Sequence, residues 1–206
     1  MKRTVLIDGS NMLFRAYYAI PAHLSTSTGQ PTNAVYGFIT MLSKLLSRKH
    51  PDYAAVVFDP VGGSFRHRES ADYKANRASM PPDLASQIPL IDRVVEALEL
   101  KVMRVTDFEA DDVIATLACQ AEKAGHQVII VSSDKDFSQL INDRVQLFDG
   151  MRDLTYNAEL VEKKFGVPPH LFVDFQALCG DKIDNIPGVP GIGKKTASKL
   201  LQDYGD

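Results

Sequence analysis

Apolar residues along this 206-residue chain recur in two alternating patterns. Five short runs predict strands, and three of them are almost wholly apolar, as is typical of strands buried on both faces of a parallel sheet. Between these runs, apolar residues return every three or four positions, which predicts helices. Strands that alternate with helices indicate an α/β fold, with a mostly parallel central sheet flanked by helices. The predicted strands are residues 4–8, 54–59, 100–105, 127–133 and 145–149, and the predicted helices are residues 34–49, 83–99 and 111–124.

The strand pattern stops near residue 155. We therefore expect an α/β core over residues 1–155 and a small helical module over residues 156–206, interrupted by loops rich in Gly and Pro. One connection, residues 60–82, is long, basic and poor in aliphatic side chains. Because long loops in compact domains are usually functional or disordered, this segment is a candidate binding element.

The composition is that of a globular protein, with 45% hydrophobic and 24% charged residues. No apolar run approaches the roughly 20 residues of a membrane span. Asp8 interrupts the first apolar run, so we expect no signal peptide. Cys119 and Cys179 belong to no metal-binding or redox motif, which predicts buried free thiols and a cytoplasmic location.

Acidic residues follow the C-terminal ends of four predicted strands. Sites in open α/β sheets form at those ends, so the acids would meet in one crevice. Each acid alone could be a turn residue or a helix N-cap, but crowded carboxylates are unfavourable unless cations neutralise them. Oxygen ligands without a Cys or His cluster favour Mg²⁺ or Mn²⁺ over zinc. The acids are Asp8, Asp59, Glu109, Asp111, Asp112, Asp134 and Asp136.

The spacing of these acids adds three expectations. Glu109 and Asp112 are three residues apart and would share one helix face, whereas Asp134 and Asp136 would point the same way in an extended segment. The sequence GDKIDN in the helical module, residues 180–185, carries two more acids, which could cap a turn or fold back onto the crevice. Two ions about 3.5–4 Å apart would stabilise both the attacking and the leaving oxygens of a phosphodiester during hydrolysis.

Six segments resemble, in order, the 5′-nuclease (flap endonuclease) family, and most closely the N-terminal 5′-3′ exonuclease domain of bacterial DNA polymerase I. The resemblance implies a PIN-like core followed by a helix-hairpin-helix. It also implies metal-dependent 5′-3′ exonuclease and flap endonuclease activity in DNA replication and repair. The segments are LIDGSNMLFRAYYA, VVFD, SFRHRESADYKANR, FEADDVIATLA, VSSDKDFSQL and GDKIDNIPGVPGIGKKTASKLL, which are spread along the whole chain from residue 6 to residue 201.

The resemblance assigns the acids to two metal ions. It implies a first site formed by Asp8, Asp59, Glu109, Asp111 and Asp112. It implies a second site formed by Asp134, Asp136, Asp181 and Asp184.

Residues 60–82 match the family's helical arch, and Lys74 and Arg77 match its catalytic basic residues. Because Lys74 and Arg77 are three residues apart, they would share one face of a helix. From there they could neutralise negative charge on the scissile phosphate. Tyr73 could stack on a base, since aromatic rings stack on nucleic-acid bases. Further candidates for DNA phosphate contacts are Arg66 and Arg68 in the same segment and, more weakly, Arg15. The alternative for this segment is a solvated basic loop.

The stretch GVPGIGKKTA, residues 188–197, looks like an ATP phosphate loop, but Lys195 stands where that motif has Ser or Thr, and no buried strand precedes it. The resemblance instead implies a DNA-binding hairpin. Its Gly-rich turn would let backbone N–H groups approach a DNA phosphate. The implied DNA contacts are Gly188, Gly191, Gly193, Lys194, Lys195 and Thr196, and the implied carbonyl ligands of a K⁺ ion are Val189 and Ile192.

The net charge of −3 argues weakly against nucleic-acid binding, but without the nine predicted ligands the rest of the chain carries +6. We therefore expect a monomer that binds DNA with a 5′ flap, overhang or nick, with a DNA polymerase as a fused or separate partner and no membrane partner. The chain ends near the second helix of the hairpin, which predicts a truncated helical module. Three alternatives stay open: a non-catalytic DNA-junction binding module, a P-loop ATPase and an RNA-directed nuclease.

Overall fold

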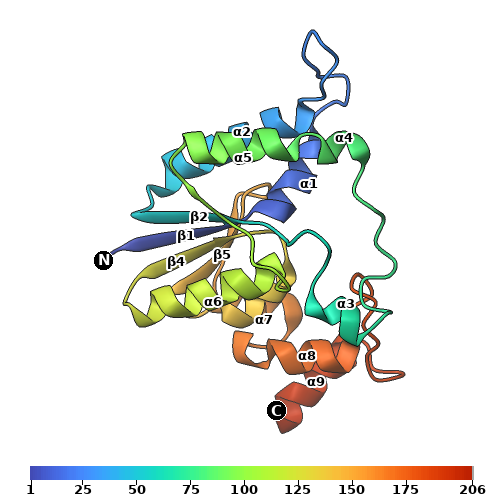
Figure 1. The fold of residues 1–206 in the computed structure, drawn as a ribbon. Coiled ribbons are helices and arrows are strands. Elements are labelled where there is room, and N and C mark those ends of the chain that lie inside the picture. Colours follow the sequence, from blue (N-terminus) through green and yellow to red (C-terminus); the bar gives the residue numbers. More distant parts are fainter. Residues whose placement is uncertain (206) are drawn as a thin grey trace.

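A six-stranded sheet lies between two layers of helices in the computed structural model, which describes residues 1–205 (Figure 1). The strand order is β3-β2-β1-β4-β5-β6, and all neighbours are parallel except β5 and β6. The strands are β1 (Arg3–Asp8), β2 (Tyr53–Val57), β3 (Lys101–Met103), β4 (Gln127–Val131), β5 (Val145–Asp149) and β6 (Leu154–Tyr156).

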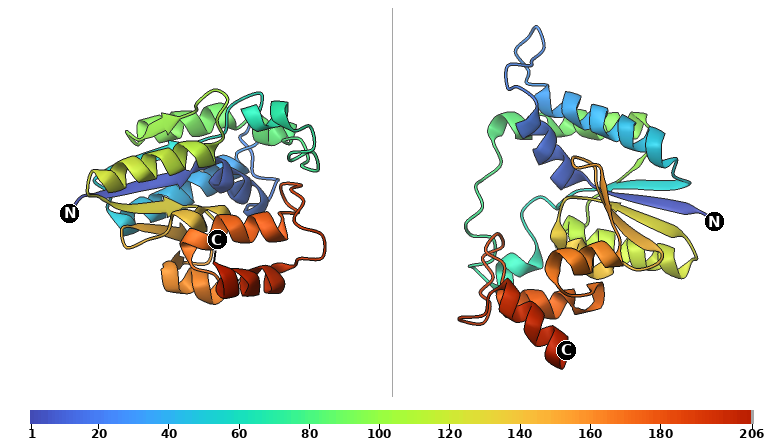
Figure 2. Two further views of the ribbon diagram at one scale, coloured as in Figure 1. Left: turned by 90° about the horizontal axis from the view of Figure 1, so that it is seen from below. Right: turned by 180° about the vertical axis from the view of Figure 1, so that it is seen from behind.

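The helices form the layers on either side of this sheet, and Figure 2 shows the same two layers from below and from behind. The first layer consists of α1 (Gly9–Ala19), α2 (Asn33–Lys49), α4 (Pro82–Ala85) and α5 (Ile88–Ala97). The second consists of α6 (Ala110–Lys123), α7 (Ala158–Phe165), α8 (Phe172–Cys179) and α9 (Lys194–Tyr204). Shorter pieces are α3 (Phe65–Glu69) and the 3-10 helices η1 (Lys135–Leu140) and η2 (Pro169–Leu171).

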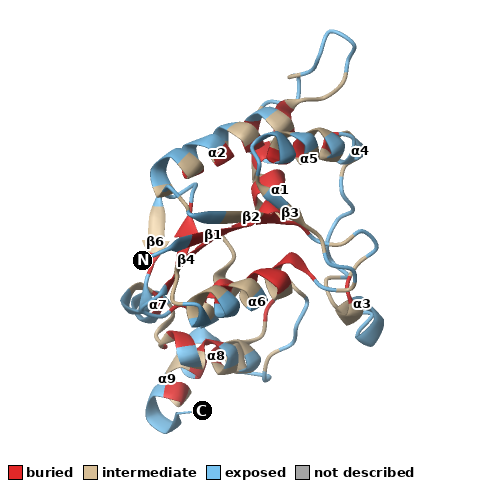
Figure 3. Ribbon diagram, turned by 60° about the vertical axis from the view of Figure 1, so that its left-hand side comes forward, coloured by how far each residue is buried: buried red, intermediate tan, exposed pale blue. Residues whose placement is uncertain are grey.

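Two hydrophobic cores fix these layers against the sheet, one on each face. Phe38 of α2 and Ile91 of α5 pack with β1 and β2 on the first face. On the second face, Ile114 of α6 shares a core with Phe172 of α8 and Leu201 of α9, so the helical module packs into the same core as α6 and the sheet. The buried residues run along the strands and the sheet-facing sides of the helices, as Figure 3 shows.

The predicted α/β fold is confirmed, and the ends of the five predicted strands differ from the observed ends by at most two residues. The strand predicted over residues 100–105 ends at Met103, because its ladder with β2 stops there and Arg104 turns to pair with Asp92 at 2.7 Å. The edge strand β6, three residues long and antiparallel to β5, was not predicted. So short an edge strand leaves little pattern in the sequence.

The helix predicted over residues 83–99 is divided into α4 and α5. Pro89 lacks the N–H that would continue a helix from α4, so the helix restarts at Ile88. The side chain of Gln87 is fully buried at the break. It accepts hydrogen bonds from the backbone N–H groups of Ala34 and Val35, which begin α2. The break therefore supplies a cap for a neighbouring helix.

The segment over residues 60–82, called the arch segment below, is helical only in α3 and at Pro82, where α4 begins. The prediction that Lys74 and Arg77 share a helix face is therefore wrong. Lys74 has a positive φ of 54°, and its backbone N–H donates to the carbonyl of Asp184 at 3.0 Å. Asp134 and Asp136 do not share the extended segment in which they would point the same way, because Asp134 caps η1 by accepting from the N–H of Asp136 at 2.9 Å and Asp136 lies within η1.

Both cysteines are free, but the prediction that they are buried is wrong. Cys119 is exposed because α6 turns Val113, Ile114 and Ala118 toward the core instead. Cys179 is half-buried at the end of α8. Within residues 1–205, no helix is long and apolar enough to cross a membrane.

We predict that Gly180→Ala lowers the free energy of unfolding by about 1–3 kcal/mol. Gly180 has φ 70° and ψ 177°, a region that is essentially restricted to glycine. An added Cβ would also lie 2.4 Å from the backbone nitrogen of Gly188. Chemical denaturation measures the change, and Gly150→Ala is the control, since its Cβ would make only an ordinary contact with Phe148 at 3.6 Å. Equal loss of stability in both variants would contradict the prediction.

Candidate metal centre

The acids gather where the strand order reverses. The strand β1 lies between β2 and β4, and the chain leaves β1 toward β2 first and reaches β4 later. Asp8 is the last residue of β1, and Asp134 follows β4 by three residues. In open α/β sheets a crevice forms at this switch point, at the carboxyl ends of the strands. The topology alone therefore brings these two acids together.

A cavity of about 210 Å³ opens at the switch point. Three candidate basic residues, Arg15, Lys74 and Arg77, lie in its wall. Four carboxylates, which we call the first acid group, line the same cavity: Asp8, Asp59, Asp111 and Asp134.

Within the first acid group, Asp8 and Asp111 are the most strongly perturbed. Burial raises the pKa of Asp8 to about 7, although the N–H of Asn11 and the hydroxyl of Ser132 donate to its carboxylate at 2.9 and 2.7 Å. Burial, and then the charges of Asp8 and Asp134, raise the pKa of Asp111 to about 8. No residue of the described chain donates a hydrogen bond to the Asp111 carboxylate. A cation would relieve this crowding.

Three further carboxylates form a second acid group, Asp136, Asp181 and Asp184, with ligand oxygens within 4.8 Å of one another. Asp181 is buried and is held by reciprocal backbone bonds with Ile186 at 2.9 and 2.8 Å. The loop of residues 180–188 therefore does fold back onto the crevice. Asp111 connects the groups, because it lines the first cavity and also a larger one of about 550 Å³ that Asp136 and Asp184 line.

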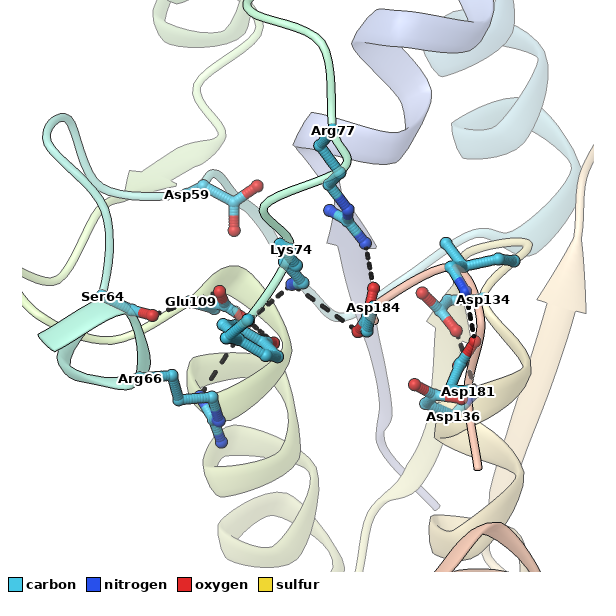
Figure 4. Close-up of polar contacts among 12 residues, drawn as sticks. Asp59, Ser64, Arg66, Lys74, Arg77, Glu109, Asp134, Asp136, Asp181 and Asp184 are labelled. Carbon is cyan, nitrogen blue, oxygen red and sulfur yellow. Dashed lines mark hydrogen bonds and ion pairs between the residues drawn. The ribbon is translucent and has the colours of Figure 1, made fainter. Parts of the chain in front are cut away.

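Two basic side chains of the arch segment reach into the crevice, as Figure 4 shows. The Lys74 ammonium donates to Glu109 at 2.8 Å and lies 3.9 Å from Asp184, and Arg77 donates to Asp184. Burial opposes the charge of Lys74, but its hydrogen bonds with Glu109 and Tyr73 and the charges of Glu109 and Asp184 together outweigh burial and raise the pKa of Lys74. The arch segment thus supplies positive charge at the boundary between the two acid groups.

Glu109 and Asp112 face the arch segment. Glu109 is the N-cap of α6, and Tyr73 and Ser64 donate to its carboxylate at 2.9 and 3.2 Å. Arg66 donates to both oxygens of Asp112 at 2.7 and 2.8 Å. Burial opposes the charge of Glu109, but the bond from Lys74 lowers its pKa, and the bond from Arg66 lowers the pKa of Asp112.

Three backbone contacts hold the arch segment to the 180–188 loop. Besides the bond from the Lys74 N–H, the side chain of Asn185 donates to the carbonyl of Asp72 at 2.8 Å, and that of Asn76 donates to the carbonyl of Lys182 at 3.1 Å. The two remaining basic candidates point to other partners. Arg68 pairs with Asp107, and Arg15 pairs with the buried Asp149 at 3.1 Å.

The predicted hairpin is formed by α8, α9 and the loop between them. Gly191 has φ 82° and open space around it, and Gly193 is the N-cap of α9. Gly188 instead packs against the protein backbone, since a Cβ there would lie 2.5 Å from the nitrogen of Gly180. The first three residues of α9, which are Lys194, Lys195 and Thr196, are exposed. The N–H of Ile192 bonds to the carbonyl of Val189 at 3.0 Å.

Four side chains that bond to the acids were not predicted. Lys135 pairs with Asp136 at 2.7 Å and with Asp181, and Gln176 donates to Asp136 at 2.7 Å. Ser132 donates to Asp8, and Ser64 donates to Glu109. The position of Lys135 between two predicted ligands was a usable signal. The contact of Gln176 with Asp136 had no signal in the sequence, because the two residues are 40 positions apart.

The donor set fits divalent cations. Both groups offer carboxylate oxygens, which are the ligands that Mg²⁺ and Mn²⁺ prefer, and burial together with neighbouring carboxylates raises the pKa values of Asp8 and Asp111. The class that this fold and site define is an α/β protein with acidic metal-binding groups at the switch point of its sheet.

The family of this chain is shown by its similarity to known proteins. Residues 3–166 match the family model "5′-3′ exonuclease, N-terminal resolvase-like domain", and residues 167–206 match "5′-3′ exonuclease, C-terminal SAM fold". The 5′-3′ exonuclease of Aquifex aeolicus is 43% identical over 205 residues, which cover 100% of this chain and 71% of the relative. DNA polymerase I of Bacillus caldotenax is 43% identical over 208 residues, which cover 99% of this chain but only 24% of the relative.

The chain therefore belongs to the 5′-3′ exonuclease family, as the sequence resemblance predicts. Its fold also matches a flap endonuclease of bacteriophage T5, solved in a complex with DNA and metal ions, with a TM-score of 0.81 at 22% identity. The match covers 100% of this chain and 76% of that one.

Proposed function

We propose that this chain is a structure-specific 5′ nuclease that hydrolyses DNA phosphodiesters near a 5′ end, in flaps, overhangs or nicks. The observation that carries the proposal is the pair of acid groups joined by Asp111, with Lys74 and Arg77 beside them. Family membership supports it, and so does the T5 structure with DNA and metal ions. We further propose that the α/β core ends at residue 155 and the helical module begins at residue 156. We also propose that the chain is a monomer and that it acts with a fused or separate DNA polymerase.

The two acid groups would hold two divalent ions, Mg²⁺ or Mn²⁺. Asp8, Asp59, Asp111 and Asp134 of the first group would hold one, and Asp136, Asp181 and Asp184 of the second would hold the other. Such ions would lower the pKa of the attacking water and stabilise the leaving oxygen. Glu109 accepts a hydrogen bond from Lys74, and Asp112 accepts one from Arg66. We therefore propose that these two acids act near the first site by orienting Lys74 and Arg66.

The arch segment would hold the scissile phosphate. Lys74 and Arg77 project to the boundary of the acid groups, where their charge would stabilise negative charge that develops on the phosphate. Tyr73 lines the 550 Å³ cavity and would contact a base or sugar there. Arg66 and Arg68 would add charge along the strand, and Arg15 would add charge in the wall of the 210 Å³ cavity.

The hairpin would bind the duplex away from the cut. Gly191 and Gly193 leave the backbone before α9 open to a phosphate, and Lys194, Lys195 and Thr196 follow on its first turn. Gly188 would act indirectly, by packing on Gly180. The carbonyls of Val189 and Ile192 are the proposed K⁺ ligands.

The test is cleavage of a 5′-labelled flap duplex and a matched single strand, with Mg²⁺ and with EDTA. We expect cuts near the junction of the flap duplex that require Mg²⁺. Binding of the flap duplex without a cut, in either Mg²⁺ or Mn²⁺, would replace the proposal by a non-catalytic DNA-junction binding module. Cleavage of a matched RNA flap in preference to DNA would favour an RNA-directed nuclease.

We predict that the double variant Lys194→Ala, Lys195→Ala binds duplex DNA about tenfold more weakly at moderate salt. If both lysines neutralise phosphates, the slope of log affinity against log salt should fall by about 2. Fluorescence anisotropy at four salt concentrations measures both quantities. The control is Lys101→Ala, Lys123→Ala, which removes the same charge from exposed positions outside the hairpin. An equal slope in both double variants would count against the hairpin as a DNA contact.

A further inference from the structure

One basic residue in the crevice, Lys135, has no part in the function proposed above. It is the first residue of η1 and lies between Asp134 and Asp136 in the sequence. Its ammonium pairs with one oxygen of Asp136 at 2.7 Å and with one oxygen of Asp181. These carboxylates come from segments 45 residues apart, and both belong to the second acid group. Lys135 therefore occupies the space between two oxygens that would ligate a metal ion.

Other donors orient both carboxylates without Lys135. The side chain of Gln176 donates to the same Asp136 oxygen at 2.7 Å. The N–H of Ile183 donates to the other oxygen of Asp181 at 2.8 Å, and Asp181 is also fixed by its backbone bonds with Ile186. The acids would keep their places if the ammonium left. The ion pairs thus supply charge compensation more than position.

An ammonium and a divalent ion cannot use these two oxygens at once. Mg²⁺ needs oxygens at about 2.1 Å in a near-octahedral arrangement, so it would lie between the same carboxylates. The Lys135 side chain is 28% exposed, against 8% for Asp181, so it has a path to solvent. Lysine carries a flexible four-carbon stem, which makes such a movement feasible.

We propose that Lys135 is an internal counter-cation of the second acid group, which a divalent ion must displace in order to bind there. The inference rests on the proposed two-metal function and adds a residue that sets the affinity of one site. Lys135 stabilises the metal-free acids and competes with the metal. The second site therefore binds more weakly than its three carboxylates alone would allow.

The test is a Mn²⁺ titration of the full chain, with free Mn²⁺ followed by electron paramagnetic resonance. In Lys135→Met we expect the weaker Mn²⁺ site to bind about tenfold more tightly, the change that loss of two partly exposed ion pairs would give. Lys135→Arg keeps the charge and should keep the weak site. Asp184→Asn in the Lys135→Met protein should remove the tightened site, which assigns it to the second acid group.

Lys123→Met is the charge-matched control, at the far end of α6 and about 20 Å from the acids that begin this helix. A merely structural role for Lys135 predicts the opposite sign, since loosened ligands bind metal less tightly. Unchanged or weaker Mn²⁺ binding by Lys135→Met, with two sites intact in the wild type, would overturn the inference alone. A wild-type chain that binds no Mn²⁺ would overturn both it and the two-metal function.

Discussion

Asp111→Asn is expected to lower the rate of flap cleavage by at least about 10³-fold. Asp111 lines both cavities, and within residues 1–205 its carboxylate receives no hydrogen bond that would explain its place in the crevice. An amide has the same shape but carries no charge, so it would bind either proposed metal ion poorly. The measurement is single-turnover cleavage of a labelled flap duplex in Mg²⁺ at saturating enzyme, which separates chemistry from DNA binding.

The same substitution should stabilise the protein in the absence of metal. Burial and neighbouring carboxylates raise the pKa of Asp111 from 3.8 to about 8 in the fold, so this carboxyl lowers the stability of the folded state progressively as the pH rises between these two values, and by a constant amount above pH 8. Asp111→Asn should therefore melt at a higher temperature than the wild type at pH 8 in EDTA, with a smaller difference at pH 5.

Asp143→Asn is the control for this variant, because Asp143 is exposed next to the N-terminal end of β5, at the edge of the sheet opposite the acids. It should change neither the rate nor the melting temperature. A rate for Asp111→Asn within tenfold of the wild type would contradict the role of Asp111 in metal binding.

The parts of the fold and site that follow from local pattern could be predicted from the sequence. Buried strands can be recognised in the sequence as apolar runs, and Asp8 and Asp134 stand at or just after the C-terminal ends of two such runs. Because the carboxyl ends of parallel strands lie at one edge of the sheet, a crevice lined by these acids could be predicted without knowing the order of the strands. The Gly-rich turn before α9 could also be predicted from local sequence, and Gly191 there has a φ of 82°.

Contacts between distant segments could not be predicted. The arch segment is not helical at Lys74 because Asp184 and Asn185, more than 100 residues further along, bind its backbone. Helical spacing carries no information about such partners. Gln87 shows the same limit, since a polar residue within an apparently continuous helix proved to be a buried cap for α2.

Lys74→Met is expected to lower the single-turnover rate by about 10²–10³-fold, the usual effect of removing one group that stabilises transition-state charge. Affinity for the flap duplex should change little, because one phosphate contact among many is lost. Lys74→Arg should recover part of the rate, since it keeps the charge near Glu109. Lys101→Met, which removes an exposed lysine at the start of β3, is the control and should cleave at the wild-type rate.

Lys74 could instead act only through Glu109, to which it donates at 2.8 Å. The double variant Lys74→Met, Glu109→Gln separates the two roles, because residues that act as a unit have non-additive effects. If Lys74 acts on the phosphate, its loss should lower the rate in the Glu109→Gln background by nearly the same factor as in the wild type. If it only orients Glu109, its loss there should have no further effect. A double variant as active as Glu109→Gln alone would therefore remove Lys74 from direct contact with the scissile phosphate and leave it as a positioning residue for α6.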